Sequence, residues 1–507
     1  MVSSSRMAAV DANAAALGVP RKQLMESSGN AVARTVRSVT DPGDEVAFVC
    51  GRGNNGGDGF VAARFLSDRA VTVYLLGRPE SIGTQIAREN WTALRAAEIP
   101  TVVVADAADL DLGSPDVVVD AMLGTGVSGA LREPERTAAA RVTELGTVVE
   151  GTADTAGAAD TAGTTVIAVD VPSGIDADTG ERTGGPESPA VAADRVVTFH
   201  DTKPGLDRVD AAVTVADIGI PTAAERFTGP GDLLGFGRDA DSHKGENGEV
   251  LVVGGGPYAG APALSARAAL RAGADLVRVA CPAGVATEIQ GFSADLIVHG
   301  VPGETLAPVH LDRLLDLAAT QDVVVIGPGL GDADETAELV RRFLARVDGR
   351  VVVDADALRV VPGVDTDAEL ICTPHQGELR EMGGETASDP GERGDRVRSF
   401  AADLGHTLLV KGAVDVIAGR ASGVGGSDDE PTVRLNRSGN PGMTVGGTGD
   451  VLAGTVGALA ARTGPFEAAA AGAYVNGLAG DAAADAHGHG LVATDLIDRL
   501  SQALYDE

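Results

Sequence analysis

Short apolar runs recur along the first half of the chain, and alanine-rich stretches of helix length separate them. The runs consist almost entirely of β-branched and other apolar residues, and they lie at 46–50, 71–76, 117–123 and 166–171. Strands without polar alternation are typical of a parallel sheet that helices cover on both faces. The pattern therefore predicts a Rossmann-like α/β domain in this half.

The second half repeats this alternation with different segments. Strands are expected at 249–255, 276–282, 322–329, 350–358, 369–375 and 407–419. Helix-length segments follow most of these strands, and the C-terminal part becomes mainly helical. A central sheet with a helical C-terminal end is consistent with a ribokinase-like α/β domain, although periodicity alone does not distinguish this fold from other wound sheets.

The length of 507 residues predicts more than one domain, because single hydrophobic cores stop growing well below this size. A low-complexity segment at 146–165 has no periodic apolar face, so we interpret it as a solvated loop. A second irregular stretch at 221–241 precedes a fresh strand. We therefore predict two domains, 1–225 and 226–507.

The charge balance excludes some classes of partner. The chain has 73 acidic and 40 basic residues and a formal net charge of -33, and its few lysines are Lys22, Lys203, Lys244 and Lys411. Nucleic acids and anionic membrane surfaces bind clustered lysine and arginine, so both are disfavoured as partners. An excess of carboxylates favours a salt-adapted cytoplasm, where ions screen the self-repulsion.

The cysteines indicate a reducing compartment. Cys50, Cys281 and Cys372 are odd in number and far apart in sequence, so neither a disulfide framework nor a metal cluster is indicated. No stretch reaches the roughly 18 apolar residues of a spanning helix, and no secretory signal is evident. We expect a cytoplasmic protein that acts on small molecules, and the sequence leaves a homo-oligomer open.

A glycine-rich loop at 51–60 connects the first predicted strand to a helix. Such a loop exposes the first amides of the helix, which suits a phosphate or another anion. Asn54, Asn55 and Asp58 add side-chain oxygens beside those amides. An ordinary glycine-rich turn is the alternative interpretation.

Two further loops follow strands of the same predicted sheet. Asn55, Asp120 and Ser173 offer only hard oxygen ligands with few negative charges, which suits a monovalent cation better than zinc. A buried Asp120 that accepts hydrogen bonds from loop amides is the alternative. Asp170 ends the fourth run and is the best candidate for a general acid or base, although it could also only bind substrate.

The segment at 440–454 is the most specific signal in the second half. Gly446, Gly447 and Gly449 precede a run of helix length, so backbone amides and the positive helix end can face a phosphoryl group during its transfer. Asp450 lies in the first turn, where a carboxylate suits a base that deprotonates an attacking hydroxyl. The alternative for Asp450 is a simple capping role.

The motifs of the first half resemble the NAD(P)H-hydrate epimerase family across roughly residues 7–220. The matching segments are 24–29, 51–60, 118–126, 168–180 and 197–206. The resemblance implies interconversion of the R and S epimers of hydrated NADH and NADPH (NADHX and NADPHX) with a potassium ion. The implied hydrate contacts are Asn54, Asn55, Gly56, Gly57, Asp58, Gly124, Thr125, Gly126, Val127, Ser128, Gly129, Ala130 and Asp170. The implied potassium ligands are Asn55, Asp120 and Ser173.

The second half resembles the ADP-dependent NAD(P)H-hydrate dehydratase family over roughly residues 240–505. The matching segments keep their order at 242–256, 326–331, 354–358, 373–378, 410–415 and 440–454. The resemblance implies that ADP phosphorylates the hydrate and that magnesium bridges the donor phosphates. The implied hydrate contacts are Ala261, Gly329, His375 and Asp450, with Asp450 as the catalytic base. The implied contacts of the adenine nucleotide are Lys411, Gly412, Ala413, Val414, Asp415 and Gly449.

Two alternatives to this interpretation stay open at the level of sequence. Ribokinase-like sheets also serve kinases of vitamin precursors and sugars, and the first half could be a binding module without catalysis. His375 is expected on the rim of a pocket. His487 and His489 lack a third ligand nearby, so a solvated loop is expected there rather than a metal site.

Overall fold

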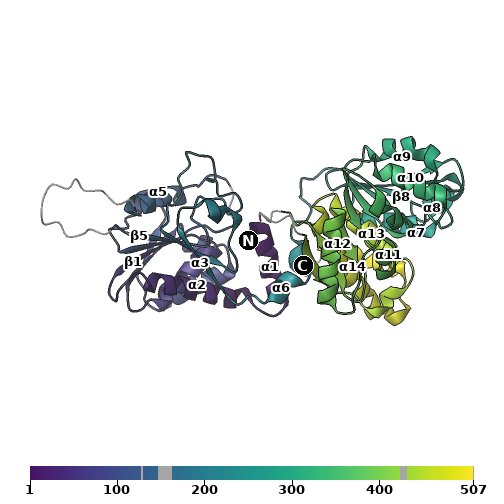
Figure 1. The fold of residues 1–507 in the computed structure, drawn as a ribbon. Helices are drawn as coiled ribbons and strands as arrows, with labels where there is room; N and C mark the ends of the chain where they lie inside the picture. The colour runs from purple at the N-terminus through teal and green to yellow at the C-terminus, as the bar shows by residue number, and fades with distance from the viewer. Residues whose placement is uncertain (127–128, 147–162, 423–430, 506–507) are drawn as a thin grey trace. The chain divides into compact units, whose positions relative to one another are not determined.

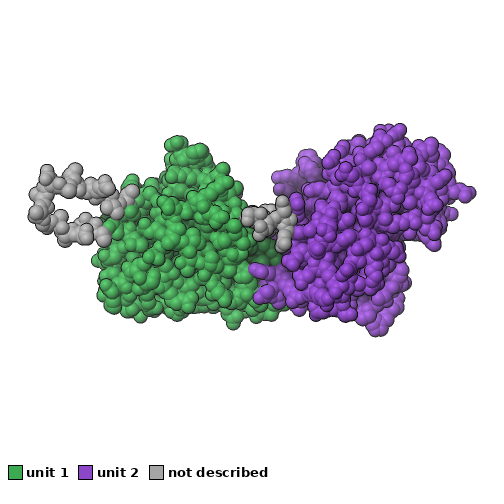
Figure 2. All heavy atoms as spheres, viewed as in Figure 1, with its two compact units in different colours: residues 1–221, 423–427 green, residues 222–422, 428–507 purple. Residues whose placement is uncertain are grey.

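The computed structural model describes residues 1–126, 129–146, 163–422 and 431–505, and these residues form two compact units. Figure 2 shows unit 1 in green and unit 2 in purple; the first ends at Pro221 and the second begins at Thr222. The sequence predicts the domain boundary between residues 225 and 226. Most of the predicted low-complexity loop, 147–162, lies outside the described residues, as do Val127 and Ser128 of the predicted substrate loop.

Unit 1 contains a seven-stranded sheet in the order β3-β2-β1-β4-β5-β6-β7, and every neighbouring pair is parallel. The sheet confirms the predicted wound α/β class of this half (Figure 1). Its strands are β1 (Glu45–Cys50), β2 (Ala70–Leu76), β3 (Thr101–Val104), β4 (Val117–Ala121), β5 (Thr165–Val169), β6 (Arg195–Phe199) and β7 (Ala212–Ala216).

The first two helices of unit 1 precede the sheet and the others connect its strands, and glycines let the loops approach the strand ends closely. The longer helices are α1 (Ser4–Ala16), α2 (Arg21–Arg37), α3 (Asn54–Phe65), α4 (Gln85–Ala96) and α5 (Glu135–Gly146). A Cβ atom at Gly51 would lie only 1.9 Å from the carbonyl oxygen of Met122. Only glycine allows this approach, so the start of α3 lies against the loop that follows β4.

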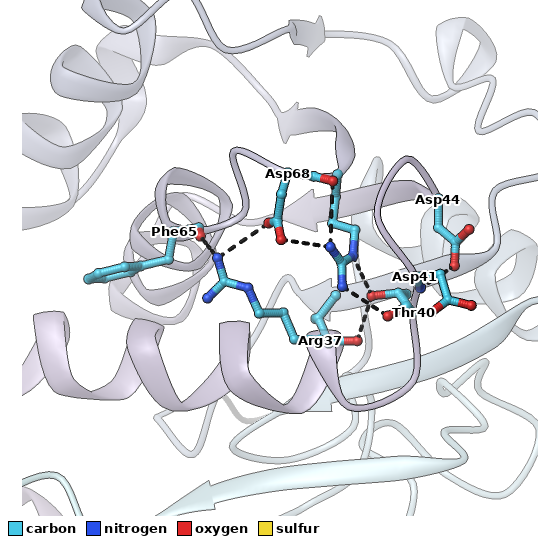
Figure 3. Close-up of polar contacts among 8 residues, drawn as sticks. Arg37, Thr40, Asp41, Asp44, Phe65 and Asp68 are labelled. Atoms are coloured by element: carbon cyan, nitrogen blue, oxygen red, sulfur yellow. Dashed lines mark hydrogen bonds and ion pairs between the residues drawn. The ribbon is translucent and has the colours of Figure 1, made fainter.

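Charged and polar side chains form a network beside the start of β2 (Figure 3). Arg69 precedes β2 and pairs with Asp68 at 2.8 Å. Its guanidinium also donates to the hydroxyl of Thr40 at 2.8 Å and to the carbonyl of the same residue at 2.9 Å. Arg37 reaches Asp68 from the end of α2 at 3.3 Å. The network ties α2 to the turn before β2, at the end of the sheet away from the predicted site.

Unit 2 contains a nine-stranded sheet in the order β10-β9-β8-β11-β12-β13-β14-β15-β16. The pairs from β10 to β14 are parallel, and β15 and β16 add antiparallel strands at one edge. The strands are β8 (Glu249–Val253), β9 (Leu276–Pro282), β10 (Ile297–Val301), β11 (Val323–Ile326), β12 (Arg350–Val353), β13 (Glu369–Cys372), β14 (Thr407–Val410), β15 (Asp415–Gly419) and β16 (Thr432–Asn436).

Helices cover both faces of the second sheet. One hydrophobic cluster joins the sheet to α7 (Gly260–Arg271), α13 (Thr448–Ala460), α14 (Pro465–His487) and α15 (Ala493–Tyr505). A second cluster joins it to α9 (Leu311–Ala318), α10 (Asp334–Leu344), α11 (Gln376–Glu381) and α12 (Pro390–Leu404). A Cβ at Gly454 would lie 1.9 Å from the carbonyl oxygen of Ser265, so α13 packs closely on α7.

All three cysteines are free and buried in strands of the two sheets. Burial raises the pKa of Cys281 to about 11 and that of Cys372 to about 12. The pKa of Cys50 also lies well above its ordinary value, first because of burial and then because of the nearby Asp120 and Asp58. The free thiols agree with the prediction that the chain has no disulfide framework. Among the described residues, no helix is both long enough and apolar enough to span a bilayer.

Candidate active sites

The first candidate site lies where β1, β4 and β5 end, and it brings the three predicted potassium ligands together. The backbone amide and hydroxyl of Ser173 both donate to the carboxylate of Asp120, each at 2.7 Å. The Ser173 hydroxyl accepts from the amide of Leu123 at 3.1 Å, and Asn55 donates through Nδ2 to the carbonyl of Leu123 at 2.9 Å. Asn55 and Ser173 therefore meet at Leu123 in the loop after β4, and Ser173 connects them to Asp120.

The oxygen atoms of this cluster fit a monovalent cation. Asp120 is fully buried, and burial raises its pKa to about 6 although the hydrogen bonds from Ser173 and Met122 oppose the shift. Asn55 uses its Nδ2 for Leu123, and no described residue donates to its Oδ1. A small cavity lined partly by Leu123 and Ser173 adjoins the cluster. The carboxylate of Asp120 accepts hydrogen bonds from loop amides, as the alternative interpretation of this residue expects. A cation bound to the cluster would be an additional contact.

Asp170 follows β5 in a left-handed conformation with φ of 66°, which few residues other than glycine adopt. One of its carboxylate oxygens, Oδ1, accepts a hydrogen bond from Thr198 at 3.1 Å and pairs with Lys203 Nζ at 3.1 Å. No described residue donates to Oδ2. The side chain of Asp170 is 14% exposed, whereas that of Lys203 is fully buried. The free oxygen is thus available to a ligand.

Two further carboxyl groups lie near Asp170. Burial, together with the nearby Asp170 and Asp11, holds the pKa of Asp58 well above its usual range, although a hydrogen bond from Ser28 opposes this shift. Burial also raises the pKa of Asp11 on α1, an effect that Arg21 opposes and Asp170 reinforces. Asp58, with its raised pKa, therefore lies close to Asp170.

The second candidate site lies at the start of α13. Gly447 precedes the helix in a left-handed conformation with φ of 96°, and the first turn follows with Thr448, Gly449 and Asp450. A Cβ added at Gly449 would lie 3.2 Å from Lys411 Nζ, so the ammonium group lies against this first turn. A lysine and the positive end of a helix together form a site for a phosphoryl group.

Carboxylates hold Lys411 in place. Its Nζ pairs with Asp354 at 2.9 Å and with Glu378 at 3.8 Å. Asp354 is almost fully buried, and its Oδ1 also accepts a hydrogen bond from Thr373 at 2.7 Å. Burial works to lower the pKa of Lys411, but Asp354 and Glu378 outweigh it, so the pKa is raised. Lys411 therefore stays charged.

Asp450 has the electrostatic setting of a base near neutral pH. Burial raises its pKa from 3.8 to about 7, and Asp354 adds to this effect while Lys411 opposes it. Its backbone carbonyl accepts a hydrogen bond from Ser265 on α7 at 2.9 Å. This hydrogen bond holds the backbone of Asp450 against α7, and Lys411 is near enough to affect the Asp450 carboxyl group electrostatically. Catalytic bases work best when their pKa is close to the working pH.

The turn between β14 and β15 carries the remaining predicted nucleotide contacts. Asp415 accepts a hydrogen bond from the amide of Gly412 at 2.9 Å and another from Asn436 at 2.9 Å. Burial raises the pKa of Asp415 to about 6. Arg393 on α12 donates to the carbonyl of Val414. These contacts fix the turn next to Lys411.

Comparisons with known proteins identify the family. Residues 250–502 match the family model of NAD(P)H-hydrate dehydratase, and residues 21–205 match that of the YjeF-related protein N-terminus. A bifunctional NAD(P)H-hydrate repair enzyme of Methanothermobacter thermautotrophicus is 42% identical, over 98% of this chain and 94% of its own length. One from Archaeoglobus fulgidus is 40% identical, over 99% and 98%. The chain belongs to the family of bifunctional NAD(P)H-hydrate repair enzymes.

Solved structures with similar folds match the second half of this repair-family chain. An ADP/ATP-dependent NAD(P)H-hydrate dehydratase from Bacillus subtilis, co-crystallised with ATP and Mg²⁺, is 26% identical over 53% of this chain and 92% of its own, with a TM-score of 0.44. A ribokinase-like superfamily protein from Enterococcus faecalis is 26% identical over 55% and 95%, with a TM-score of 0.46. The full-length relatives, rather than these structures, favour a repair enzyme over a vitamin or sugar kinase.

The residues predicted for the dehydratase half of the repair enzyme contact one another in small groups. Lys411, Gly449 and Asp450 meet at α13, and a Cβ at Gly329 would lie 3.3 Å from the Cβ of Ala261. His375 caps α11, because its Nδ1 accepts hydrogen bonds from the amides of two following residues, at 2.9 Å and 3.1 Å. Its ring is 60% exposed, so a ligand contact through Nε2 stays a prediction.

The sequence did not single out several residues that the structure places in the two sites. They are Asp11, Thr198, Asp354, Thr373 and Glu378, and Lys203 was noted only as a scarce lysine. Asp354, Thr373 and Glu378 lie in segments that carry the family resemblance, so their positions after strands could have identified them. At His487, the structure gives only a contact of 3.8 Å with Asp495, and no group of metal-binding side chains forms among the described residues.

Proposed function

We propose that this chain repairs hydrated NADH and NADPH in two steps. Residues 1–225 interconvert the R and S hydrates, and residues 226–507 dehydrate the S form at the expense of ADP, which gives AMP and phosphate. The observation that carries the proposal is the meeting of Lys411 and Asp450 at the first turn of α13. Relatives that match almost the whole chain are named bifunctional NAD(P)H-hydrate repair enzymes, which supports a chain with two activities.

The dehydration begins with proton transfer to Asp450. This carboxylate takes the proton of the hydroxyl on the hydrated ring, and the oxygen then attacks the terminal phosphorus of ADP while AMP leaves. Lys411 and the amides at the start of α13 stabilise the negative charge on the phosphoryl oxygens. The bond from carbon to the phosphorylated oxygen then breaks, the adjacent carbon loses a proton, and the ring double bond is restored.

The substrates would occupy the two sides of Asp450. We propose that the hydrate contacts Ala261, Gly329, His375 and Asp450, and that the nucleotide contacts residues 411–415 and Gly449. The contacts of Asp415 and Arg393 with the turn support this assignment, because they fix its backbone before the nucleotide arrives.

Magnesium would neutralise charge on the donor phosphates. The described residues contain no group of three or more metal-binding side chains, which fits an ion carried mainly by phosphate oxygens and water with one or two carboxylates. Asp356 lies close enough to affect Asp450, and its Oδ2 accepts a hydrogen bond from the amide of Gly331 at 2.8 Å. We propose Asp356 as the carboxylate that would hold magnesium there.

The rate of dehydration should depend on pH through Asp450. A base must be unprotonated to act, and the pKa of Asp450 is raised to about 7. The anionic fraction, and with it kcat/KM, should therefore fall about tenfold for each pH unit below 7 and level off above it. The measurement is S-hydrate dehydration with saturating ADP from pH 5.5 to 9. A profile that stays flat from pH 5.5 to 7 would exclude Asp450 as the base.

The epimerase site places two carboxyl groups, Asp170 and Asp58, near each other. We propose that Asp170 accepts the proton that the epimerisation removes and that Asp58, whose pKa burial holds well above its usual range, returns a proton. A carboxyl group with a raised pKa is suited to donate a proton. The hydrate would also contact Asn54–Asp58 and the loop at 124–130, of which 127–128 lie outside the described residues.

A potassium ion held by Asn55, Asp120 and Ser173 would offset the charge of the bound hydrate. We expect Asp120→Ala or Ser173→Ala to raise the potassium concentration needed for half-maximal epimerisation by at least about tenfold, because each variant removes oxygen ligands or their support. The measurement is R-hydrate epimerisation at increasing K⁺ and constant ionic strength. Dehydration of the S hydrate is the control, and equal losses in both activities would indicate a folding defect instead.

The whole proposal is tested with an equilibrium mixture of R and S hydrates. With ADP and magnesium, the protein should return all of the mixture to reduced nicotinamide, which is followed by its absorbance, and AMP and phosphate should form in equal amounts. If the reaction stops when the S hydrate is exhausted, the epimerase assignment is wrong. If nucleotide has no effect, the dehydratase assignment is wrong.

A further inference from the structure

The surroundings of Asp170 carry an inference that deepens the proposed epimerase function and rests on it. Lys203 is fully buried, although a lysine is costly to bury without partners. Its Nζ donates to the hydroxyl of Thr198 at 3.0 Å, to the carbonyl of Phe199 at 2.9 Å and to that of Asp201 at 3.1 Å. It also lies 3.1 Å from Asp170 Oδ1.

These contacts fix one side of the Asp170 carboxylate. Thr198 and Lys203 both approach Oδ1, whereas Oδ2 receives no hydrogen bond from the described residues. The backbone of Asp170 is also held in place, since its amide donates to the carbonyl of Val197 at 2.8 Å in a left-handed conformation. A carboxylate held at one oxygen presents the other in a fixed direction.

The end of β6 and the turn that follows it supply every member of this support. Thr198 and Phe199 end the strand, and His200 follows in a second left-handed conformation with φ of 69°. This turn places the ammonium group of Lys203 next to the end of β6. The ammonium group also contacts Asp170, which follows the neighbouring strand β5. Strained residues of this kind cluster where a structure holds functional groups in place.

We propose that Lys203 and Thr198 are positioning residues of the epimerase reaction, which orient Asp170 so that its Oδ2 faces the hydrated ring. Lys203 does not contact the substrate, because its side chain has no exposed surface. It acts through Asp170 alone. Misplacement of a catalytic group by about 1 Å costs on the order of 10²-fold in rate.

The experiment measures R-to-S epimerisation without nucleotide, so that no dehydration occurs. Lys203→Met should lower kcat about 10²-fold with little change in KM, and Thr198→Val should lower it about tenfold. In an Asp170→Asn background, the same two replacements should change the rate only slightly, because the group they orient is absent. A double-mutant cycle isolates this coupling.

A second measurement separates positioning from stability. Asp170→Asn leaves the Lys203 charge without its counterion, and Lys203→Met leaves the buried carboxylate without its cation. Each single variant should therefore unfold at a lower temperature than wild type. The double variant should lose less stability than the sum of the two single losses. Arg69→Met is the matched control, because Arg69 is also a nearly buried cation paired with a carboxylate of the same unit, and it directly precedes β2 at the amino-terminal end of that strand. It should lower stability and leave kcat unchanged.

The outcomes decide between the hypotheses. If wild-type protein does not epimerise the R hydrate, the proposed function itself is wrong. If it does, and both variants retain the wild-type kcat, the positioning role is wrong. Equal losses with and without Asp170 would also overturn it, since they would show that Lys203 and Thr198 only support the fold. Where Lys203→Met does not fold, the cycle of Thr198→Val with Asp170→Asn gives the same decision.

Discussion

Asp450→Asn should lower the rate of nucleotide-dependent dehydration by about 10²- to 10⁴-fold, the usual contribution of a positioned general base. Asparagine keeps the size and the hydrogen-bonding capacity of the side chain in the first turn of α13 but cannot accept the proton. The measurement is kcat for the S hydrate with saturating ADP and magnesium. The remaining activity should also lose the rise in rate between pH 6 and 7 that the pKa of about 7 produces.

Two controls show whether this loss is chemical. Epimerisation of the R hydrate should continue at the wild-type rate, because its residues belong to unit 1. The folded state raises the pKa of Asp450 from 3.8 to about 7, so ionisation of this group reduces stability as the pH rises through that interval. The asparagine variant should therefore be at least as stable as wild type at pH 8. Near-normal dehydration with unchanged nucleotide binding would show that Asp450 only caps the helix.

Asp170→Asn should have the second largest effect and should act on the other reaction. Epimerisation of the R hydrate should fall by about 10²- to 10⁴-fold, because the amide cannot serve as the base. Lys203 would keep its hydrogen bonds to Thr198 and to the two backbone carbonyls, so the turn after β6 has acceptors left for the ammonium. The measurement is the appearance of the S epimer by chromatography in the absence of nucleotide.

The S hydrate supplies the control for this second variant. Its dehydration should proceed normally, and a mixture of epimers should then be repaired only to the extent of its S content. If the R hydrate is consumed at the wild-type rate, Asp170 has at most a binding role and another group is the base.

The sequence predicted most of the central strands and missed the edge strands β3 and β10, for a physical reason. The strands β1, β4, β5, β8, β11 and β12 are buried on both faces, so each reads as a continuous apolar run. The edge strand β10 has its isoleucine at 40% exposure and a histidine and a glycine in the middle. Two residues of the edge strand β3 are exposed as well. Such strands lack the signal that continuous burial leaves in a sequence.

Some residues of the candidate sites could be predicted from the sequence, and others could not. Asn55, Asp120 and Asp450 lie in short motifs next to a strand or helix end, and local spacing was enough to select them. The partners of those residues depend on strand order. Thr198 and Lys203 reach Asp170 because β6 pairs with β5, and Asp354 reaches Lys411 across the ends of β12 and β14. Asp11 comes from a helix that precedes the whole sheet. No local pattern encodes these contacts.

The burial of the cysteines makes them reporters of how each unit opens. Thiols react with alkylating reagents as thiolates, and both burial and the raised pKa values protect Cys50, Cys281 and Cys372 in the folded chain. Cys50 lies in the sheet of unit 1, and the other two lie in that of unit 2. Mass spectrometry of peptides alkylated at increasing denaturant concentration would therefore give a separate unfolding curve for each sheet, without any added label.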